Sequence, residues 1–136
     1  MVCIYCGSGT QVVNSRLQKR LNHVWRRRRC VECGAVFSTH EMPAYEDSWR
    51  VKTPEGALMP FQRDKLFLSL YKSCEHRPGA AEDAGGLTAT VIGLLRHQDD
   101  KGLFEAENIS LTAWEVLNNF DKAAAVHYQA FHPAFF

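Results

Sequence analysis

The stretch "VWRRRRCVEC", residues 24–33, places four consecutive arginines directly before a Cys-x-x-Cys pair. A second pair, Cys3-Ile-Tyr-Cys6, precedes the first in the chain, with 23 residues between Cys6 and Cys30. A glycine follows each pair, Gly7 and Gly34, which fits a tight turn that needs a positive φ. Two such pairs in a short segment are typical of a zinc ribbon, in which four thiolates hold one ion in a closed tetrahedral site.

We therefore expect one Zn²⁺ per chain, with four ligands: Cys3, Cys6, Cys30 and Cys33. A redox dithiol would need a single pair near a βαβ pattern, and neither condition holds. An iron–sulfur cluster bound by the same four cysteines remains the alternative. The sequence shows neither a secretory signal nor an apolar run long enough to span a membrane. We thus expect a cytoplasmic protein with no membrane association, whose thiols stay reduced and free to bind metal.

Segments rich in β-branched and aromatic residues surround the two pairs. They are "QVVNSRL" (residues 11–17), "HVWRRRRC" (23–30) and "AVFSTHE" (35–41). They predict three short antiparallel strands closed by one metal. About 40 residues bury too little apolar surface to fold alone, so the metal is expected to hold this module together.

The basic residues are concentrated in this module. Residues 1–40 contain seven Lys and Arg against one acidic residue, whereas residues 41–136 contain nine against fourteen. In a strand, Arg26 and Arg28 would share one face and Arg27 and Arg29 the other. With one acid in the module, pairing inside the chain is not expected to neutralise them.

An external polyanion is the natural partner for such a strand, and Arg16 adds to the same surface. The planar guanidinium forks of arginine suit phosphates and guanine edges. We therefore predict binding to double-stranded DNA, with a solvated charge run as the alternative.

The second half of the sequence predicts a β-hairpin followed by four helices. Two short strands flank the turn at Pro54-Glu-Gly56, and a helix is expected after Pro60 that ends at Pro78-Gly79. Further helices are expected over residues 81–97, after an N-cap at Ser110, and from Asp121 onward, with "KGLFEAEN" (101–108) as a loop. The fold class is thus α+β. Cys74, Trp49 and Trp114 are expected to be packing residues.

Catalytic constellations are missing from the sequence. It has no nucleophile–base pair, no phosphate-binding glycine loop and no paired catalytic carboxylates, so we predict that the protein is not an enzyme.

The pattern "CxxC…SR…RRRRC..CG..F.T.E", followed by "VK…G…PF...KL", resembles the bacterial NrdR family over the whole chain. That family consists of transcriptional repressors of ribonucleotide reductase genes, which join a DNA-binding zinc ribbon to an ATP-cone domain that senses ATP and dATP. The resemblance implies a zinc-ribbon domain at 1–45 and an ATP-cone-like domain for nucleotide binding and oligomerisation at 46–136.

The resemblance also implies roles for individual residues. Arg16 and Arg26–Arg29 would bind promoter operators. Lys52 and Lys65 would hold the phosphates of ATP or dATP, and Val51 and Phe61 would form part of the adenine pocket. The nucleotide would change the size of a homo-oligomer, and the repressor would be nucleoid-associated when bound to DNA.

Two stretches depart from the family pattern. The hairpin reads "KTPEG" where a second basic residue is usual, and the C-terminal stretch has Ala125, His127, His132 and Pro133 where Tyr, Arg, Tyr and Arg are expected. Three alternatives therefore stay open: a protein-docking regulatory module that does not bind DNA, a diverged member whose cone only oligomerises, and a zinc-ribbon factor that binds RNA or polymerase.

Overall fold

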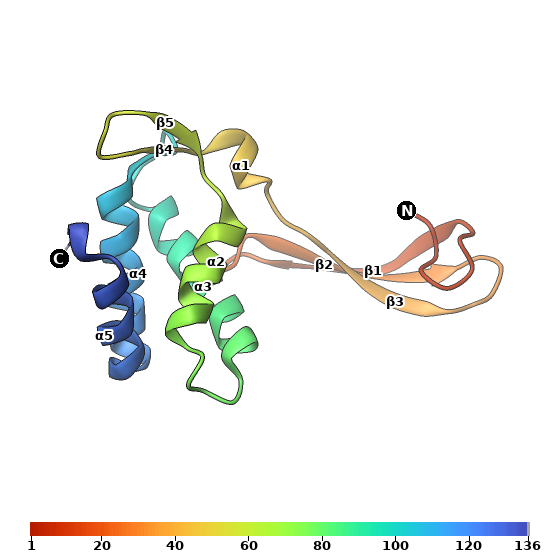
Figure 1. The fold of residues 1–136 in the computed structure, drawn as a ribbon. Coiled ribbons are helices and arrows are strands. Elements are labelled where there is room, and N and C mark those ends of the chain that lie inside the picture. The colour runs from red at the N-terminus through yellow and green to blue at the C-terminus, as the bar shows by residue number, and fades with distance from the viewer. Residues whose placement is uncertain (136) are drawn as a thin grey trace. The chain divides into compact units, whose positions relative to one another are not determined.

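The structure is a computed structural model that describes residues 1–135. The chain forms two compact units, Met1–Pro43 and Ala44–Phe136 (Figure 1). The first contains a three-stranded antiparallel sheet and the second contains mainly helices with a small sheet. The predicted α+β class is therefore confirmed.

The sheet of the first unit consists of β1 (Thr10–Gln18), β2 (His23–Cys30) and β3 (Val36–Glu41), in the order β1-β2-β3. Both neighbouring pairs are antiparallel. The turn between β1 and β2 contains Asn22 with φ of 50°, a left-handed conformation that asparagine tolerates better than most residues. These three strands are the ones that the sequence predicts.

The pairing of β1 with β2 is interrupted by a bulge. Asn14 lies opposite Arg27, but Val12 lies opposite Arg28, so Val13 has no partner of its own. A bulge of this kind inserts one residue into a strand and shifts the alternation of the side chains beyond it. The residues of β1 before Val13 and those after it must therefore be assigned to the two faces of the sheet separately.

Only a small core stabilises the first unit. Its buried apolar residues are Cys3, Cys30 and Phe37, with Ala35 partly buried against them. Large apolar side chains such as Ile4, Tyr5 and Leu17 stay exposed. Burial on this scale cannot offset the loss of chain entropy in a unit of this size, which agrees with a fold that depends on a bound metal.

The second unit combines a small sheet with helices. Its elements are α1 (Tyr45–Ser48), β4 (Arg50–Lys52), β5 (Leu58–Pro60), α2 (Arg63–Ser73), α3 (Ala80–Arg96), β6 (Leu103–Glu105), α4 (Ala106–Phe120), α5 (Lys122–Phe131) and the 3₁₀ turn η1 (Pro133–Phe135). The sheet order is β5-β4-β6, with β5 antiparallel and β6 parallel to β4. The predicted hairpin and four main helices are present.

Two details of this unit differ from the prediction. Residues 101–108 are not simply a loop, because Leu103–Glu105 pairs with β4 as a third strand. The next helix begins at Ala106 instead of after Ser110, and Ser110 is a buried residue inside it. Both errors have one cause. The three-residue strand β6 forms because it pairs with the distant β4, which the local sequence does not reveal, and α4 begins directly where β6 ends.

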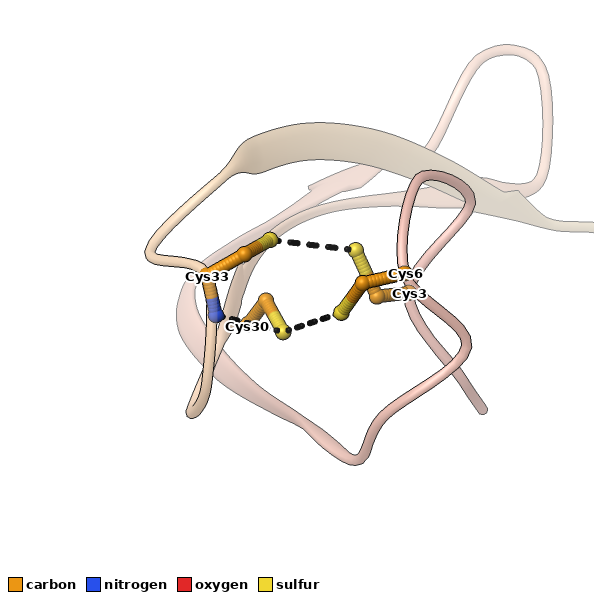
Figure 2. A group of neighbouring side chains, drawn as sticks. All are labelled: Cys3, Cys6, Cys30 and Cys33. Carbon is orange, nitrogen blue, oxygen red and sulfur yellow. Dashed lines mark hydrogen bonds between the residues drawn. The ribbon is translucent and has the colours of Figure 1, made fainter.

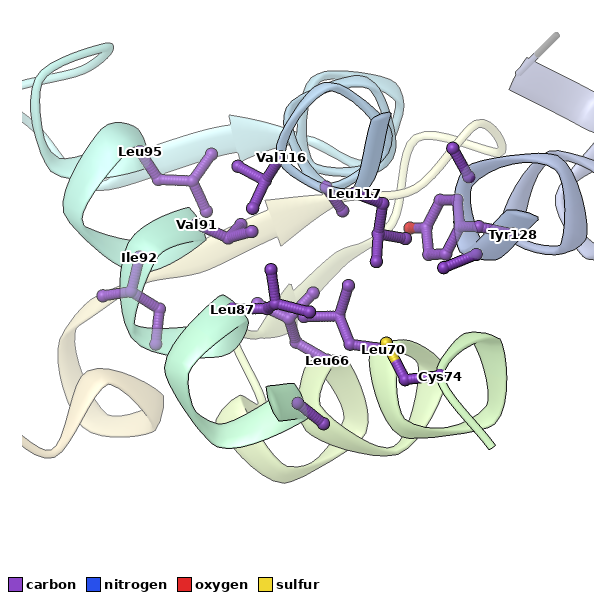
Figure 3. Close-up of a cluster of buried hydrophobic side chains, with 14 of the residues drawn as sticks. Leu66, Leu70, Cys74, Leu87, Val91, Ile92, Leu95, Val116, Leu117 and Tyr128 are labelled. Carbon is purple, nitrogen blue, oxygen red and sulfur yellow. The ribbon is translucent and has the colours of Figure 1, made fainter. Parts of the chain in front are cut away.

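Side chains from α2, α3, α4 and α5 meet in one apolar core (Figure 3). Leu70, Val91, Leu95 and Leu117 are completely buried within it. Cys74 is also fully buried, and burial raises the pKa of its thiol, as expected for a packing residue.

Trp49 joins the small sheet to this core. Its ring lies 4.8 Å from that of Phe104 and 5.4 Å from that of Phe61, measured between ring centroids. Gly102 has φ of 70°, and a Cβ there would lie 2.6 Å from Trp49 Cδ1. The close approach of β6 to Trp49 therefore requires glycine, and Trp49 is confirmed as a packing residue.

An ionic cluster connects the end of α2, the start of α3 and the junction between α4 and α5. Arg77 donates from Nε to Asp83 Oδ2 at 2.8 Å and from Nη1 to Asp121 Oδ2 at 2.9 Å. His76 Nε2 also donates to Asp121 Oδ2, at 2.8 Å. The other oxygen of Asp121 accepts from the amides of Ala123 and Ala124, so Asp121 is the N-cap of α5.

Replacing Asp121 is expected to destabilise the second unit in a pH-dependent way. Hydrogen bonds from His76 and Arg77 hold the pKa of Asp121 well below its ordinary value of 3.8. Because the pKa is lowered in the folded state, the stabilisation is present above pH 4 and is lost as pH falls further. We expect Asp121→Ala to lower Tm by about 5 °C at pH 7. Asp121→Asn, which keeps a cap oxygen but has no charge, should lower Tm by less.

The measurements are thermal unfolding for Tm and urea unfolding for the free energy, both followed through the NMR indole signals of Trp49 and Trp114, which belong to the second unit. The gap in stability between wild type and Asp121→Asn should shrink between pH 6 and pH 3. A constant gap over this range would show that the charge of Asp121 contributes nothing.

Candidate metal centre and nucleic-acid interface

The four predicted metal ligands come together at one end of the first unit's sheet (Figure 2). The sulfur atoms of Cys3, Cys6, Cys30 and Cys33 all lie within 4.8 Å of one another. Cys3 Sγ is 3.8 Å from Cys33 Sγ, and Cys6 Sγ is 3.4 Å from Cys30 Sγ. A tetrahedral Zn²⁺ with Zn–S bonds near 2.3 Å requires sulfurs about 3.8 Å apart. The residues present therefore fit zinc.

Two tight turns direct these sulfurs inward. The glycines after the pairs, Gly7 and Gly34, have φ of 78° and 71°, as the sequence predicts. The amide of Tyr5 points at Cys3 Sγ, and the amides of Glu32 and Cys33 point at Cys30 Sγ, each at 3.4 Å. Amide dipoles aimed at sulfur favour the thiolate, which is the form that binds metal.

The thiols of Cys6 and Cys33 differ in pKa. The backbone and hydroxyl of Ser8 lower the pKa of Cys6 to about 6. The amide of Ala35 also lowers the pKa of Cys33, but burial and the three neighbouring sulfurs outweigh it and raise this pKa to about 11. Four thiolates so close together repel one another, and a divalent cation among them removes that repulsion.

The register of the sheet divides the arginines of β2 between two faces. Arg26 and Arg28 are half-buried on one face, where Arg26 bonds to Ser15 Oγ at 3.0 Å and to Glu41 Oε2 at 3.4 Å. Arg28 donates to Thr10 Oγ1 at 3.3 Å. The expectation that no acid inside the chain would pair with these arginines is therefore wrong for Arg26.

The other face presents arginines without partners. We call it the arginine face and define it by the residues that cross-strand pairing places there: Gln11, Asn14, Arg16, Trp25, Arg27 and Arg29. Arg27 and Arg29 are exposed, and among residues 1–135 neither guanidinium has a hydrogen bond or an ion pair. The guanidinium of Arg16 lies 5.9 Å from the ring centroid of Trp25, a contact that leaves its donors free. This face can offer three arginine forks to an outside ligand.

A cavity of about 400 Å³ lies in the second unit. It includes three residues of the predicted nucleotide site, Val51, Phe61 and Lys65, but Lys52 does not line it. The reason is strand alternation: Val51 is half-buried in β4, so its neighbour Lys52 points to the opposite face and is exposed.

Other lining residues were not singled out from the sequence as site residues. Ser69, Ser110 and Tyr128 bring three hydroxyl groups to the cavity, and Glu55 and Gln62 add polar groups. Burial raises the pKa of Tyr128, while the hydroxyls of Ser110 and Ser69 lower it. The sequence did contain a signal for two of these lining residues: Ser69 and Ser110 are serines among the apolar positions of a helix.

The C-terminal departures from the family pattern occupy different places. His132 lines the cavity, and its ring stacks on Tyr128 with centroids 3.9 Å apart. His127 lies outside the lining, 3.4 Å from Ser73 Oγ and stacked on Phe131, and Ala125 is buried in the core. Of the two histidines, only His132 is thus placed to contact a ligand in this cavity.

A four-cysteine cluster on a three-stranded antiparallel sheet defines a zinc-ribbon protein. Residues 1–41 match the family described as "Transcriptional repressor NrdR-like, N-terminal domain". Proteins named transcriptional repressor NrdR are similar over nearly the whole chain. The one from Sinorhizobium medicae is 34% identical over 138 residues, covering 99% of this chain and 85% of the relative. The one from Heliobacterium modesticaldum is 34% identical over 136 residues, covering 99% and 88%.

The chain belongs to the NrdR family of transcriptional repressors. This membership confirms the resemblance read from the sequence and the prediction of a zinc ribbon. It also agrees with the prediction that the protein is not an enzyme, because the relatives are named as repressors. Within the described residues, no helix is both long and apolar enough to cross a lipid bilayer.

Proposed function

We propose that the protein is a zinc-dependent repressor that binds double-stranded promoter DNA through the arginine face and is regulated by an adenine nucleotide. The observation that carries the DNA-binding part is the set of exposed, unpaired guanidiniums of Arg16, Arg27 and Arg29 on one face of a metal-clamped sheet. The names of the relatives support the regulatory role.

The geometry of the ribbon suits a DNA groove. A two-stranded β-ribbon fits the major groove of B-DNA, where arginine forks can bond to guanine O6 and N7. Arg27 and Arg29 are two residues apart on β2, and Arg16 comes from the neighbouring strand β1. Asn14 and Gln11, opposite Arg27 and Arg29, add amide groups of the kind that bond to adenine. Arg26 and Arg28, with partners inside the unit, would support the strand and contact DNA less.

In this proposal a single Zn²⁺ keeps the sheet rigid. It would be held by the four cysteines, and its role would be structural, because a closed four-thiolate site leaves no open coordination position. Rigidity matters because guanidiniums on a flexible strand would lose entropy on binding.

The cavity of the second unit is the proposed site for ATP or dATP, which makes residues 46–136 an ATP-cone-like domain. Val51 and Phe61 would contact the adenine and Lys65 the phosphates. Lys52 could reach only a phosphate that extends beyond the cavity. The N-termini of α2 and α4 support an anionic ligand: Gln62 and Ala106 line the cavity, and neither helix has a side-chain cap.

ATP and dATP would regulate the repressor if each of them favoured a homo-oligomer of a different size. A ligand shifts such an equilibrium only by its difference in affinity between the states. Because the chain belongs to the NrdR family, we propose that it regulates ribonucleotide reductase genes. Light scattering of the zinc-loaded protein alone, with ATP and with dATP tests this step, and identical masses in all three would exclude oligomeric regulation.

DNA binding is tested by the salt dependence of affinity for a promoter duplex, measured by fluorescence anisotropy. Three phosphate contacts per chain predict a slope of log K against log salt near −3 and a loss of roughly 40-fold between 50 and 200 mM salt. A slope near zero would contradict DNA binding and favour the protein-docking alternative. A matching affinity for single-stranded RNA would favour the RNA-binding alternative.

A further inference from the structure

A pair of histidines extends the arginine face to the third strand of the sheet. His40 of β3 lies directly opposite Trp25 of β2, and paired residues of antiparallel strands point to the same face. His23 is two residues before Trp25 on β2, so strand alternation places it on this face as well. The two imidazole rings meet edge to face, with centroids 5.3 Å apart. The arginine face is therefore continued by two groups that can carry a proton.

The two imidazoles differ in their exposure. His40 is exposed, whereas His23 is half-buried. Nε2 of His23 is buried and has no hydrogen-bond partner among residues 1–135. A positive charge on His23 would make this nitrogen a buried, charged donor without an acceptor, which is costly. His40 is thus the imidazole that can take up a proton and meet a ligand, and His23 supports its ring.

The charged side chains on this side of the sheet are cations. Besides the arginines of the face itself, the turn between β1 and β2 adds Lys19 and Arg20. The first unit has two carboxylates, and neither shares the face with His40. Glu41 bonds to an arginine on the opposite face, and Glu32 lies in the turn that follows β2. A protonated His40 would therefore be free to bond to an outside anion.

His40 lies at the edge of the sheet opposite to Arg16. Arg16 pairs with Trp25 and Trp25 with His40, so the three residues form one row across the strands. Neighbouring strands are about 4.8 Å apart, which puts the backbones at Arg16 and His40 roughly 10 Å apart. The major groove of B-DNA is about 12 Å wide. A sheet whose middle strand points its arginines at the groove floor would bring Arg16 and His40 toward the phosphates on either side.

Building on the proposed DNA-binding function, we infer that protonated His40 is a further DNA contact, which bonds to a backbone phosphate and makes DNA binding tighter as pH falls. Histidine is the side chain whose charge ordinarily changes between pH 5 and 8, and a neighbouring phosphate favours its charged form. DNA binding therefore takes up a proton, and the contact is lost as pH rises. His23 is a positioning residue that acts through the ring of His40.

The test is fluorescence anisotropy of the full-length, zinc-loaded protein with the promoter duplex at pH 8.0 and pH 6.5, with zinc content measured at both. We expect the affinity to be roughly fivefold to tenfold higher at pH 6.5 and the salt slope to be steeper by about 1. Equal or weaker binding at pH 6.5 overturns this inference, and binding at pH 8.0 then leaves the proposed function intact. Failure to bind at either pH overturns both.

Variants of the two histidines assign the proton. His40→Gln keeps a polar side chain but cannot become charged, so it should abolish the pH dependence and change the affinity at pH 8.0 by less than about twofold. His23→Ala should reduce the pH dependence, and His23→Phe, which restores a ring beside His40, should recover it. Retention of the full pH dependence by His40→Gln would overturn the inference, as would its loss in His23→Phe.

His97→Gln is the matched control. His97 is an exposed histidine at the C-terminal end of α3 in the second unit, so its replacement should leave the pH dependence unaltered. Calorimetry of wild type at pH 7.0, in two buffers of different ionisation enthalpy, measures the proton directly. We expect an uptake of up to about one proton per chain on binding to the duplex, and an uptake of zero would contradict the role of His40.

Discussion

Replacing Cys30 or Cys33 with serine is expected to unfold residues 1–43 and to leave residues 44–135 folded. The first unit has only three buried apolar residues, two of which are cysteines of the metal site. Binding of a structural zinc contributes on the order of 10–16 kcal/mol in zinc-finger peptides, far more than this core can supply. The second unit has its own large core and should not depend on the metal.

The expected result is visible in a ¹H–¹⁵N NMR spectrum together with a zinc assay. Signals of β1, β2 and β3 should collapse to random-coil positions, zinc content should fall from one per chain to near zero, and DNA affinity should be lost. Cys74→Ala is the matched control, because Cys74 is buried in the core of the second unit and is not one of the four clustered cysteines. It should keep full zinc content. A zinc-free serine variant with a folded first unit would contradict the structural role of the metal.

The second large effect is expected from the two faces of β2. Replacing both Arg27 and Arg29 with alanine should weaken binding to the promoter duplex by about 100-fold at 100 mM salt, with the salt slope reduced by about 2. Their side chains have no partners within the described chain, so the fold and zinc content should not change.

The comparison variant carries Arg26→Ala and Arg28→Ala. These side chains bond to Ser15, Glu41 and Thr10, so their loss should mainly lower the stability of the first unit. DNA binding below the melting temperature should fall much less than for the Arg27 and Arg29 pair. Equal losses from the two pairs would mean that both faces of β2 contact DNA. Lysine at 27 and 29 should recover the salt slope but not the full affinity, because lysine lacks the planar fork.

Local patterns in the sequence predicted the first unit well for physical reasons. Paired cysteines have one low-energy way to meet a metal, and the strands between them are short and rich in β-branched residues. The sequence contained less information on which arginines of β2 bond inside the unit and which stay without partners. Glu41 pairs with Arg26 only because β3 returns alongside β2, a contact that charge counts over residues 1–40 could not include.

In the second unit, the helices followed from apolar periodicity, whereas β6 and the true start of α4 did not. Three residues such as Leu103–Glu105 carry no strand signal of their own and take their conformation from β4. Ser110 looked like a cap because serine commonly begins helices, yet here it is a buried residue inside α4 that lines the cavity. The positions of Val51 and Lys52 on opposite faces could have been inferred from strand alternation alone.

The bulge at Val13 has a bearing on how this protein tolerates insertions and deletions. Beyond it, Gln11 pairs with Arg29 and Val12 with Arg28. If Val13 instead paired regularly with Arg28, Val12 would lie opposite Arg29 and Gln11 would leave the arginine face. Deleting the codon for Val13 would thus remove the bulge and keep Val12 opposite Arg28 and Gln11 opposite Arg29, so β1 has one position at which the loss of a residue leaves the faces near the metal unchanged.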